Sequence, residues 1–408
     1  MSTVTTDRTA ATDRAGGTPG EVFRAFLKLG VTSFGGPIAH LGYFRDELVT
    51  RRRWVGERDY AELVALSQFL PGPASSQVGF ALGLLRAGPM GALAAWLAFT
   101  LPSAVLMVAF AYGAPLLGGV LGSGVLEGLK IVAVAIVAQA VWGMARSLTP
   151  DPRRAAIAVG AATLVLLLAG TAGQLAAIVL GALAGLVLCR MPAEQAPPPL
   201  PFAVSRRAGL VSLAVLVALL VLLPVAAAAF GGPVLDLADG FFRAGALVFG
   251  GGHVVLPLLQ AEFVGTPWLT AEEFLAGYGA AQAMPGPLFT FAAYLGALAA
   301  PGAAGLVTAA IALVAVFLPG FLILIGVLPF WNGLRVRPGA QSLMRGANAA
   351  VVGILAAALY DPVFVTAVVD PGSFALALAC FVLLVSWRTP PWAVVIVGAL
   401  GGVLLAMT

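Results

Sequence analysis

The sequence predicts an all-α polytopic membrane protein built from two inverted-topology repeats with broken or re-entrant helices. Of its 408 residues, 60% are hydrophobic and only 10% are charged, whereas a soluble domain is about 25% charged. So few charged residues cannot cover a water-exposed surface. Apolar runs recur from about residue 89 to the end of the chain, and a helix of ~20 such residues crosses ~30 Å of hydrocarbon. Barrel strands of about ten alternating residues are absent.

The N-terminal segment, residues 1–21, is polar and lacks the apolar core of a signal peptide. We therefore expect a disordered cytoplasmic tail. The two cysteines, Cys189 and Cys380, lie far apart within apolar runs, and they predict neither a disulfide nor a metal site. The net charge of +4 is spread over the loops. Because positive loops of a membrane protein report its orientation, this charge predicts no nucleic-acid partner.

An internal repeat divides the chain. The segment from Phe26 reads FLKLGVTSFGGPIAHLGYFRDELV, and the segment from Phe241 reads FFRAGALVFGGGHVVLPLLQAEFV. Chance similarity between apolar segments rarely keeps charges, glycines and prolines in the same order, so we interpret the pattern as a duplication. The matched positions are Lys28 with Arg243, Phe34-Gly35-Gly36 with Phe249-Gly250-Gly251, Glu47 with Glu262, Trp54 with Trp268, Gln68 with Gln282, Pro71-Gly72-Pro73 with Pro285-Gly286-Pro287, Leu101-Pro102 with Leu318-Pro319, and Gly128 with Gly346.

The duplication predicts the organisation of the chain. We expect a first transporter repeat over 22–190, a cytoplasmic linker over 191–207, a connecting span over 208–230 and a second repeat over 231–408. Loop charges predict the orientation of the repeats. The loop after the first Phe-Gly-Gly segment carries five arginines between residues 45 and 58, whereas its counterpart carries three glutamates and no Lys or Arg. The positive-inside rule then places the N-terminus in the cytoplasm and inverts the second repeat.

Four segments are too interrupted to be read directly as spans: 22–44, 60–85, 241–263 and 274–298. If each is a re-entrant hairpin, the chain has about nine full spans plus four hairpins, and every loop charge obeys the positive-inside rule. Each arm of about ten residues would reach ~15 Å, which is the bilayer midplane. If each segment spans fully, the chain has about 13 spans and the loop with three consecutive arginines lies outside. The hairpin interpretation is preferred.

The interruptions themselves indicate a binding site. Residues 68–77 read QFLPGPASSQ and residues 282–291 read QAMPGPLFTF. A broken helix within lipid leaves backbone groups unpaired, which is tolerated where the backbone lines a cavity. Helix starts at such breaks favour anions. The predicted substrate-binding residues are Lys28, Ser33, Gly35, Gly36, Gln68, Pro71, Gly72, Pro73, Ser75, Ser76, Arg243, Gly250, Gly251, His253, Gln282, Pro285, Gly286, Pro287 and Thr290.

These residues also have plainer interpretations. The Pro-Gly-Pro motifs can be structural kinks, the Gly-Gly motifs can serve close helix packing, and the two cations can extend to the membrane surface. Charged residues elsewhere are candidates for coupling or gating, or else begin solvated loops and form ion pairs within one helix. These candidates are Glu47, Glu262, Glu127, Lys130, Arg345 and Asn348. No cluster of carboxylates predicts a metal site.

At these motifs the sequence resembles a known family. SFGGPIAHLGYF, QFLPGP, GGGHVVLPLL and GYGAAQAMPGPLFTFAAYLGA are similar to signatures of the chromate ion transporter family in its long, two-domain form, over residues 22–388. The resemblance implies a multi-pass protein of the bacterial inner membrane that exports chromate and confers chromate resistance. The tetrahedral dianion fits the anion receptor inferred from the breaks. Sulfate has the same shape and charge, so geometry alone does not separate the two.

The leading functional hypothesis is therefore a secondary active chromate exporter. The chain has no Walker-type motif and no soluble domain, so an ion gradient or the membrane potential must supply the energy. The alternatives are a transporter that takes up or exchanges sulfate or another oxyanion, and an anion channel. An enzyme is not predicted, because the polar residues include no clear nucleophile, base and acid set. We expect no cofactor; the expected partners are the anion and the lipid bilayer, and a homodimer is compatible with the sequence.

Overall fold

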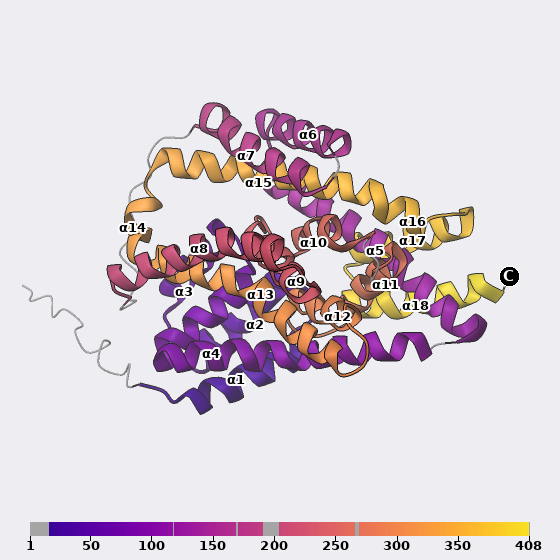
Figure 1. Cartoon of the computed structure of the whole chain (residues 1–408), viewed down its shortest axis with the longest axis horizontal. Coiled ribbons are helices and arrows are strands. Elements are labelled where there is room, and N and C mark those ends of the chain that lie inside the picture. The colour runs from indigo at the N-terminus through magenta and orange to yellow at the C-terminus, as the bar shows by residue number, and fades with distance from the viewer. Residues whose placement is uncertain (1–15, 117, 169, 191–203, 266–268, 408) are drawn as a thin grey trace, which may run out of the picture.

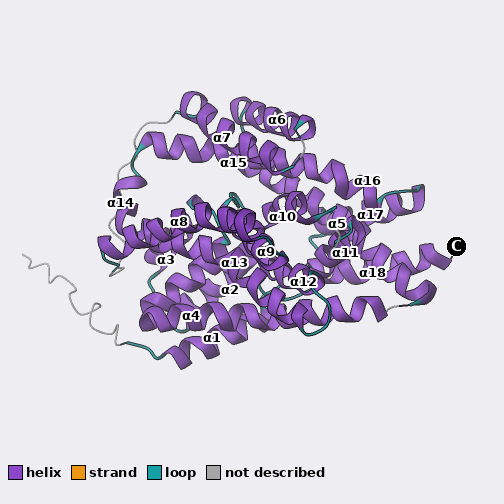
Figure 2. Cartoon of the chain, viewed as in Figure 1, coloured by secondary structure: helices purple, strands orange, loops and turns teal. Residues whose placement is uncertain are grey.

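The computed structural model describes residues 16–116, 118–168, 170–190, 204–265 and 269–407. Within these ranges every regular element is a helix (Figure 2), which confirms the predicted all-α fold class. Residues 1–15 of the predicted tail and 191–203 of the predicted linker lie outside the described residues. The first helix begins at Pro19, three residues before the predicted start of the repeat, because the Thr18 side chain caps it.

The helices of the first half run in the order expected from the repeat, and one long helix then connects the halves. They are α1 (Pro19–Thr32), α2 (Gly36–Phe44), the π-helical segment η2 (Arg45–Arg51), α3 (Glu57–Phe69), α4 (Ala74–Gly113), η3 (Ala114–Leu116), α5 (Gly119–Leu148), α6 (Pro152–Leu167) and α7 (Thr171–Leu188), with α8 (Arg206–Phe230) as the connection.

The second half repeats this order. Its elements are α9 (Pro233–Ala246), η4 (Gly252–Val254), α10 (Val255–Phe263), α11 (Ala271–Ala281), η5 (Leu288–Thr290), α12 (Phe291–Leu298), α13 (Ala304–Val327), η6 (Leu328–Phe330), α14 (Trp331–Leu334), α15 (Pro338–Ala358), η7 (Leu359–Phe364), α16 (Val365–Ala367), α17 (Pro371–Val385) and α18 (Pro391–Met407). Thus α9 to α12 correspond to α1 to the first part of α4, and α15 corresponds to α5.

The first broken segment turns back on itself. The rings of Phe26 on α1 and Phe44 on α2 pack edge to face with centroids 5.4 Å apart. Arg52, after η2, stacks on the Trp54 ring, and so does Arg86. Arg86 in turn pairs with Glu21 in the first turn of α1. The segment therefore begins and ends on one side of the molecule, as the hairpin interpretation predicts.

The other three broken segments return in the same way. In α4, Ala87 and Gly88 leave helical geometry, so residues 74–86 form a short arm that ends beside the start of α1. In the second repeat, Phe241 of α9 packs on Phe263 at the end of α10, with ring centroids 4.4 Å apart. Tyr294 of α12 donates a hydrogen bond to the carbonyl of Glu273 at the start of α11. Each pair of short helices is a hairpin.

In the described part of the chain, six helices are long and apolar enough to cross a membrane: Ala74–Leu116, Gly119–Leu148, Thr171–Leu188, Arg206–Phe230, Ala304–Leu334 and Pro338–Ala367. Shorter apolar helices also occur, among them Pro371–Val385 and Pro391–Met407. These observations support the polytopic membrane protein that the sequence predicts, and the count of about nine full spans stays a prediction. We call the side at which α1 begins the N-side and the side at which α18 ends the C-side; they lie left and right in Figure 1.

The last two helices of each repeat pack against a helix of the other repeat. α17 and α18 of the second repeat pack on α5, and α6 and α7 of the first pack on α15 (Figure 1). Glycines permit the close approach: a Cβ on Gly128 would lie 2.2 Å from the carbonyl of Gly398, and one on Gly346 would lie 2.1 Å from the carbonyl of Gly181. This mutual exchange joins the repeats into one body around α5 and α15.

Candidate functional site

The four helix breaks meet at the centre of the molecule. The backbone N–H of Gly72, in the first Pro-Gly-Pro turn, donates to the carbonyl of Val248 at 2.7 Å. In the equivalent contact of the second repeat, the N–H of Gly286 donates to the carbonyl of Ser33 at 2.8 Å. Each Pro-Gly-Pro turn is thus tied to the Gly-Gly break of the other repeat. Pro37 and Gly252, which follow the two Gly-Gly breaks, also lie against each other.

Each Pro-Gly-Pro turn packs against a proline-containing helix of the other repeat, the first turn against α13 and the second against α4. A Cβ on Gly72 would lie 2.9 Å from Cα of Gly320, and a Cβ on Gly286 would lie 2.9 Å from Oγ of Ser103. Both glycines have positive φ, +118° and +95°, which other residues rarely adopt. Glycine is therefore required in both turns for conformation and for space.

These turns have no N–H group to spare, because the prolines have none and the glycine N–H groups are already bonded. The spare groups belong to the helices that start there: α2, α4, η4 with α10, and η5 with α12. None of these four starts has a side-chain cap. Thr18, Asp151 and Thr270 cap three other helices, and α3, α5 and α7, like the helices at the breaks, begin without a side-chain cap. First-turn N–H groups without a cap need another acceptor, and the positive end of the helix dipole favours an anion.

Polar side chains around the breaks also lack protein partners. Among the described residues, Oγ of Ser33, Oγ of Ser76 and Oδ1 of Asn348 are buried atoms without a hydrogen-bond partner. Hydroxyl and amide groups of this kind normally find a partner when they are buried. Together with the uncapped helix starts, they form a buried, donor-rich centre that suits a small anion.

Three of the predicted residues near the breaks have polar contacts within the protein. Thr290 Oγ1 donates to the carbonyl of Pro287, and His253 Nδ1 lies 2.7 Å from the hydroxyl of Tyr278. Ser75 Oγ lies 3.3 Å from Nδ1 of His40. These contacts fix the orientation of the side chains.

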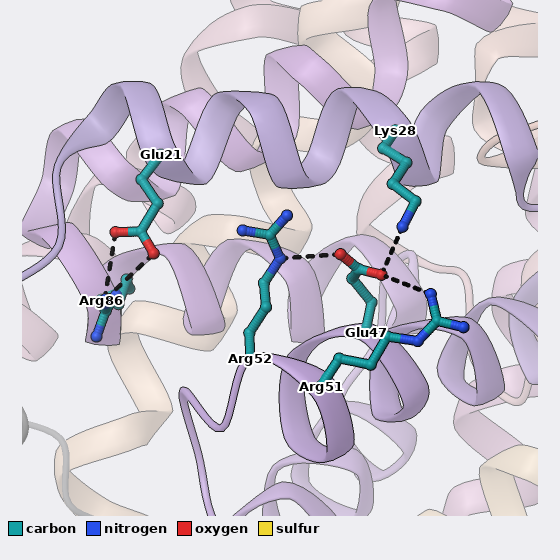
Figure 3. Close-up of polar contacts among 6 residues, drawn as sticks. All are labelled: Glu21, Lys28, Glu47, Arg51, Arg52 and Arg86. Atoms are coloured by element: carbon teal, nitrogen blue, oxygen red, sulfur yellow. Dashed lines mark hydrogen bonds and ion pairs between the residues drawn. The ribbon is translucent and has the colours of Figure 1, made fainter.

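The predicted cations lie away from the breaks, in two equivalent ion pairs. Lys28 Nζ is 2.8 Å from Glu47 Oε2, and Arg243 Nη2 is 2.8 Å from Glu262 Oε2. Each pair joins the two arms of its hairpin. Figure 3 shows the first pair, in which Arg52 also bonds Glu47 at 2.9 Å. The structure therefore places two predicted substrate-binding residues, Lys28 and Arg243, in ion pairs with two predicted coupling residues, Glu47 and Glu262.

The surroundings of the two pairs differ in charge. Glu47 is shared by Lys28, Arg51 and Arg52. Hydrogen bonds from Lys28 and Arg52 hold the pKa of the Glu47 carboxyl below its ordinary value, although burial opposes the shift. Arg243 instead serves two carboxylates, Glu262 and Asp239. The first cluster therefore has an excess of positive charge and the second an excess of negative charge.

Two cavities occupy equivalent places between the repeats. The N-side cavity, about 450 Å³, lies between α3, α14 and α15 and includes Gln68, Arg345 and Asn348. The C-side cavity, about 330 Å³, lies between α4, α5, α11 and α12 and includes Glu127 and Lys130. Leu148 at the end of α5 lines the same cavity as the first half of α15, so these two equivalent helices run in opposite directions. This is the relation expected of inverted repeats.

The predicted residues thus fall into three groups. At the breaks lie Ser33, Gly35, Gly36, Pro71, Gly72, Pro73, Ser75, Ser76, Gly250, Gly251, His253, Gln282, Pro285, Gly286, Pro287 and Thr290. Lys28, Glu47, Arg243 and Glu262 form the hairpin ion pairs. Gln68, Glu127, Lys130, Arg345 and Asn348 line the two cavities, and Lys130 pairs with Glu127 at 2.7 Å.

The sequence reasoning missed two contributors. Gln77 links the repeats, because its side-chain amide donates to the carbonyls of Pro71 and Gly320, each at 2.9 Å. Ser103 and Gly320 follow the matched Leu-Pro pairs and seat the Pro-Gly-Pro turns. The repeated Leu-Pro pair was the available signal, but sequence alone did not say what would pack against it.

Inverted repeats, paired hairpins and a buried polar centre between helix breaks define an integral membrane transporter for small solutes. The comparison with known families gives the particular family. The model described as "Chromate transporter" matches twice, over residues 20–186 and 235–403, once for each repeat. The chain belongs to the chromate transporter family.

Relatives cover most of the chain. A "Probable chromate transport protein" of Synechococcus elongatus is 30% identical over 82% of each chain. A "Chromate transport protein" of Pseudomonas aeruginosa is 28% identical over 93% of this chain and 90% of its own length, and one of Cupriavidus metallidurans is 27% identical over 92% and 90%. No solved structure matches.

Proposed function

We propose that this protein is a secondary active transporter that exports chromate from the cytoplasm across the bacterial inner membrane and thereby confers chromate resistance. The observation that carries the proposal is the buried centre where four uncapped helix starts meet beside Ser33 and Ser76, whose hydroxyls have no protein partner. A tetrahedral dianion would accept hydrogen bonds from these groups. The printed names of the relatives from Pseudomonas and Cupriavidus support chromate as the anion.

Charge supports the proposed direction. The N-side carries the arginine-rich cluster of Arg51, Arg52 and Arg53, which the positive-inside rule assigns to the cytoplasm, and with it the N-terminus. An inside-negative potential then drives a dianion outward by ~4.6 kcal/mol per 100 mV, twice the value for one charge. Export therefore needs no nucleotide, and a coupled ion would add to this driving force.

The test is chromate flux into inverted membrane vesicles, with the membrane potential and the pH gradient varied independently. We expect saturable uptake that rises with a vesicle potential attracting anions. Alanine at Ser33 or Ser76 is expected to raise KM, whereas Ser147→Ala serves as a control because that hydroxyl bonds only its own helix. Uptake that does not saturate would instead indicate a channel.

Sulfate is the second candidate substrate, because it has the same shape and charge and the centre presents the same donors to either anion. Competition in the same vesicles separates the two. Labelled sulfate that is carried faster than chromate, with chromate as a weak competitor, would overturn the proposed substrate.

A further inference from the structure

The N-side and C-side cavities have opposite charge. The N-side cavity is lined by two arginines and one glutamate, Arg335, Arg345 and Glu62, which gives a net charge of +1. The C-side cavity is lined by three glutamates and one lysine, which gives a net charge of −2. These residues are Glu127, Glu272, Glu273 and Lys130.

One charge of this three-charge difference arises at positions that the repeat makes equivalent, and Glu272 and Glu273 supply the other two. With Gly128 aligned to Gly346, Arg345 corresponds to Glu127, and Asn348 corresponds to Lys130. The same backbone position therefore presents a cation in one cavity and a carboxylate in the other. An anion approaching the N-side cavity is attracted, and an anion approaching the C-side cavity is repelled.

The two cavities also differ in their access to the helix breaks. Asn348 lines the N-side cavity, and its Oδ1 lies 3.6 Å from the position of a Cβ on Gly250, so this one residue touches both the cavity and the break. On the C-side, α11 packs directly on α5 just beyond the cavity: a Cβ on Gly279 would lie 2.2 Å from the carbonyl of Leu129. The N-side cavity thus shares Asn348 with the surroundings of the Gly250 break, whereas α11 and α5 are in close contact next to the C-side cavity.

Arg345 is the cation in position to bind an arriving anion. Glu62 is paired with Arg335, and Arg345 has no carboxylate partner among the described residues. Arg345 also borders a neighbouring cavity of about 370 Å³ that is lined by Arg153, Arg154 and Arg190. The positive field therefore continues outward from the N-side cavity along the surface. Gln68 and Asn348 add side-chain amides to the lining of the N-side cavity.

We propose that the N-side cavity is a capture site for a tetrahedral oxyanion, with Arg345 as its specificity-determining cation, and that the carboxylates of the C-side cavity oppose recapture after release. This inference rests on the proposed function, and it adds a charge difference that makes the affinity for the anion differ between the N-side and the C-side. Arginine suits this role because its planar guanidinium can bond two oxyanion oxygens at once.

The experiment measures initial rates of chromate uptake at graded concentrations in inverted vesicles, which expose the N-side, and in right-side-out vesicles, which expose the C-side. Arg345→Glu is expected to raise the N-side KM at least about ten-fold, and Arg345→Lys to raise it by less, because lysine keeps the charge but cannot bond two oxyanion oxygens in the planar geometry of a guanidinium. Arg388→Glu is the matched control, because Arg388 is exposed and lies on another loop. In the unmodified protein the N-side KM should rise with ionic strength, because salt screens the field.

On the C-side, Glu272→Lys is expected to lower the KM for uptake from that face while the N-side KM stays unchanged. Asp236→Lys is the control, since Asp236 is also an exposed acid in the first turn of a helix. Equal KM changes for Arg345→Glu and Arg388→Glu, or a salt-independent N-side KM, would overturn the capture site while leaving chromate transport intact. If the unmodified protein carries no chromate from either face, the proposed function itself fails.

Discussion

Replacing Arg243 by alanine is expected to destabilise the protein far more than replacing its equivalent, Lys28. The reason lies in what each substitution leaves behind. Without Lys28, Glu47 keeps the bond from Arg52 Nε at 2.9 Å. Without Arg243, Asp239 and Glu262 both lose their cation, and their side chains are only 8% and 11% exposed.

The magnitudes follow from burial. The Lys28 side chain is 51% exposed, so its pair is close to a surface ion pair and contributes about 0.2–1 kcal/mol. Breaking a buried pair costs about 3–5 kcal/mol because a charge remains without compensation. Arg243 is 32% exposed and Glu262 still accepts a hydrogen bond from Thr171, so we discount that range to about 2–4 kcal/mol. The expected difference between the two variants is therefore about 1–4 kcal/mol.

The free energy of unfolding can be followed by tryptophan fluorescence of the purified protein as SDS is added to mixed micelles. A double-mutant cycle sharpens the test. Glu262→Gln removes one of the two uncompensated charges, so Arg243→Ala should cost less in that background than in the unmodified protein. Glu47→Gln should change the cost of Lys28→Ala only slightly, because Lys28 is exposed.

The reasoning is refuted if Lys28→Ala and Arg243→Ala have equal effects within about 0.5 kcal/mol, the usual error of additivity. It is also refuted if Glu262→Gln leaves the cost of Arg243→Ala unchanged. In either case the charge left behind in the second hairpin would not be what stabilises it.

Three further predictions concern the breaks and the topology. Gly286→Ala should destabilise the protein by about 1–3 kcal/mol more than Gly302→Ala, because both glycines have positive φ but an added Cβ would lie 2.9 Å from Ser103 Oγ at Gly286 and meet nothing within 4 Å at Gly302; equal unfolding free energies would contradict this. Alanine at all of Pro71–Pro73 should let the helix continue and abolish chromate binding to the folded protein, and unchanged affinity in equilibrium dialysis would show that the turn is only a kink. Cysteine introduced at Arg53 should be labelled from the cytoplasm and cysteine at Glu272 from outside, and labelling of both from one side would rule out the inverted arrangement.

The breaks could be predicted from the sequence because proline and glycine have strict backbone consequences. Pro-Gly-Pro cannot continue a helix, and Phe-Gly-Gly repeats at the matching position of the second half. What the sequence could not say is that Gly72 would bond Val248 and that Gly286 would bond Ser33. Those contacts join residues that are more than a hundred positions apart, and only the pseudo-symmetric assembly of the two repeats brings them together.

The sequence also left open that the cation and the carboxylate of each hairpin form an ion pair. Lys28 and Glu47 were each singled out, but as a substrate ligand and a coupling residue rather than as partners. The separation of 19 residues is the same for Arg243 and Glu262, which is a signal that the cation and carboxylate of each hairpin meet. A hairpin of two short helices returns the chain to its starting depth, and the equal spacing follows from equal arm lengths.

The exchange of helices between the repeats was beyond sequence reasoning. Glycine-rich faces occur on α5, α7, α15 and α18, and any two of them could pack closely by composition. The choice of Gly128 against Gly398, and of Gly346 against Gly181, depends on the course of the whole chain. Local pattern identifies surfaces that can approach closely, but it does not pair them.

The symmetry of the backbone and the asymmetry of the charges have different consequences for transport. Two inverted repeats with the same breaks give two half-pathways of the same geometry, and a symmetric pathway by itself favours neither direction. The residues that keep their identity between the repeats, such as Pro71-Gly72-Pro73 and Pro285-Gly286-Pro287, are those that fix the backbone at the centre. The residues that change sign, Arg345 and Glu127, face the two aqueous ends. In the proposed function, the membrane potential and the anion gradient set the net direction of transport, the charges at the ends change the affinity for the anion on each side, and the shared centre determines which anion is carried.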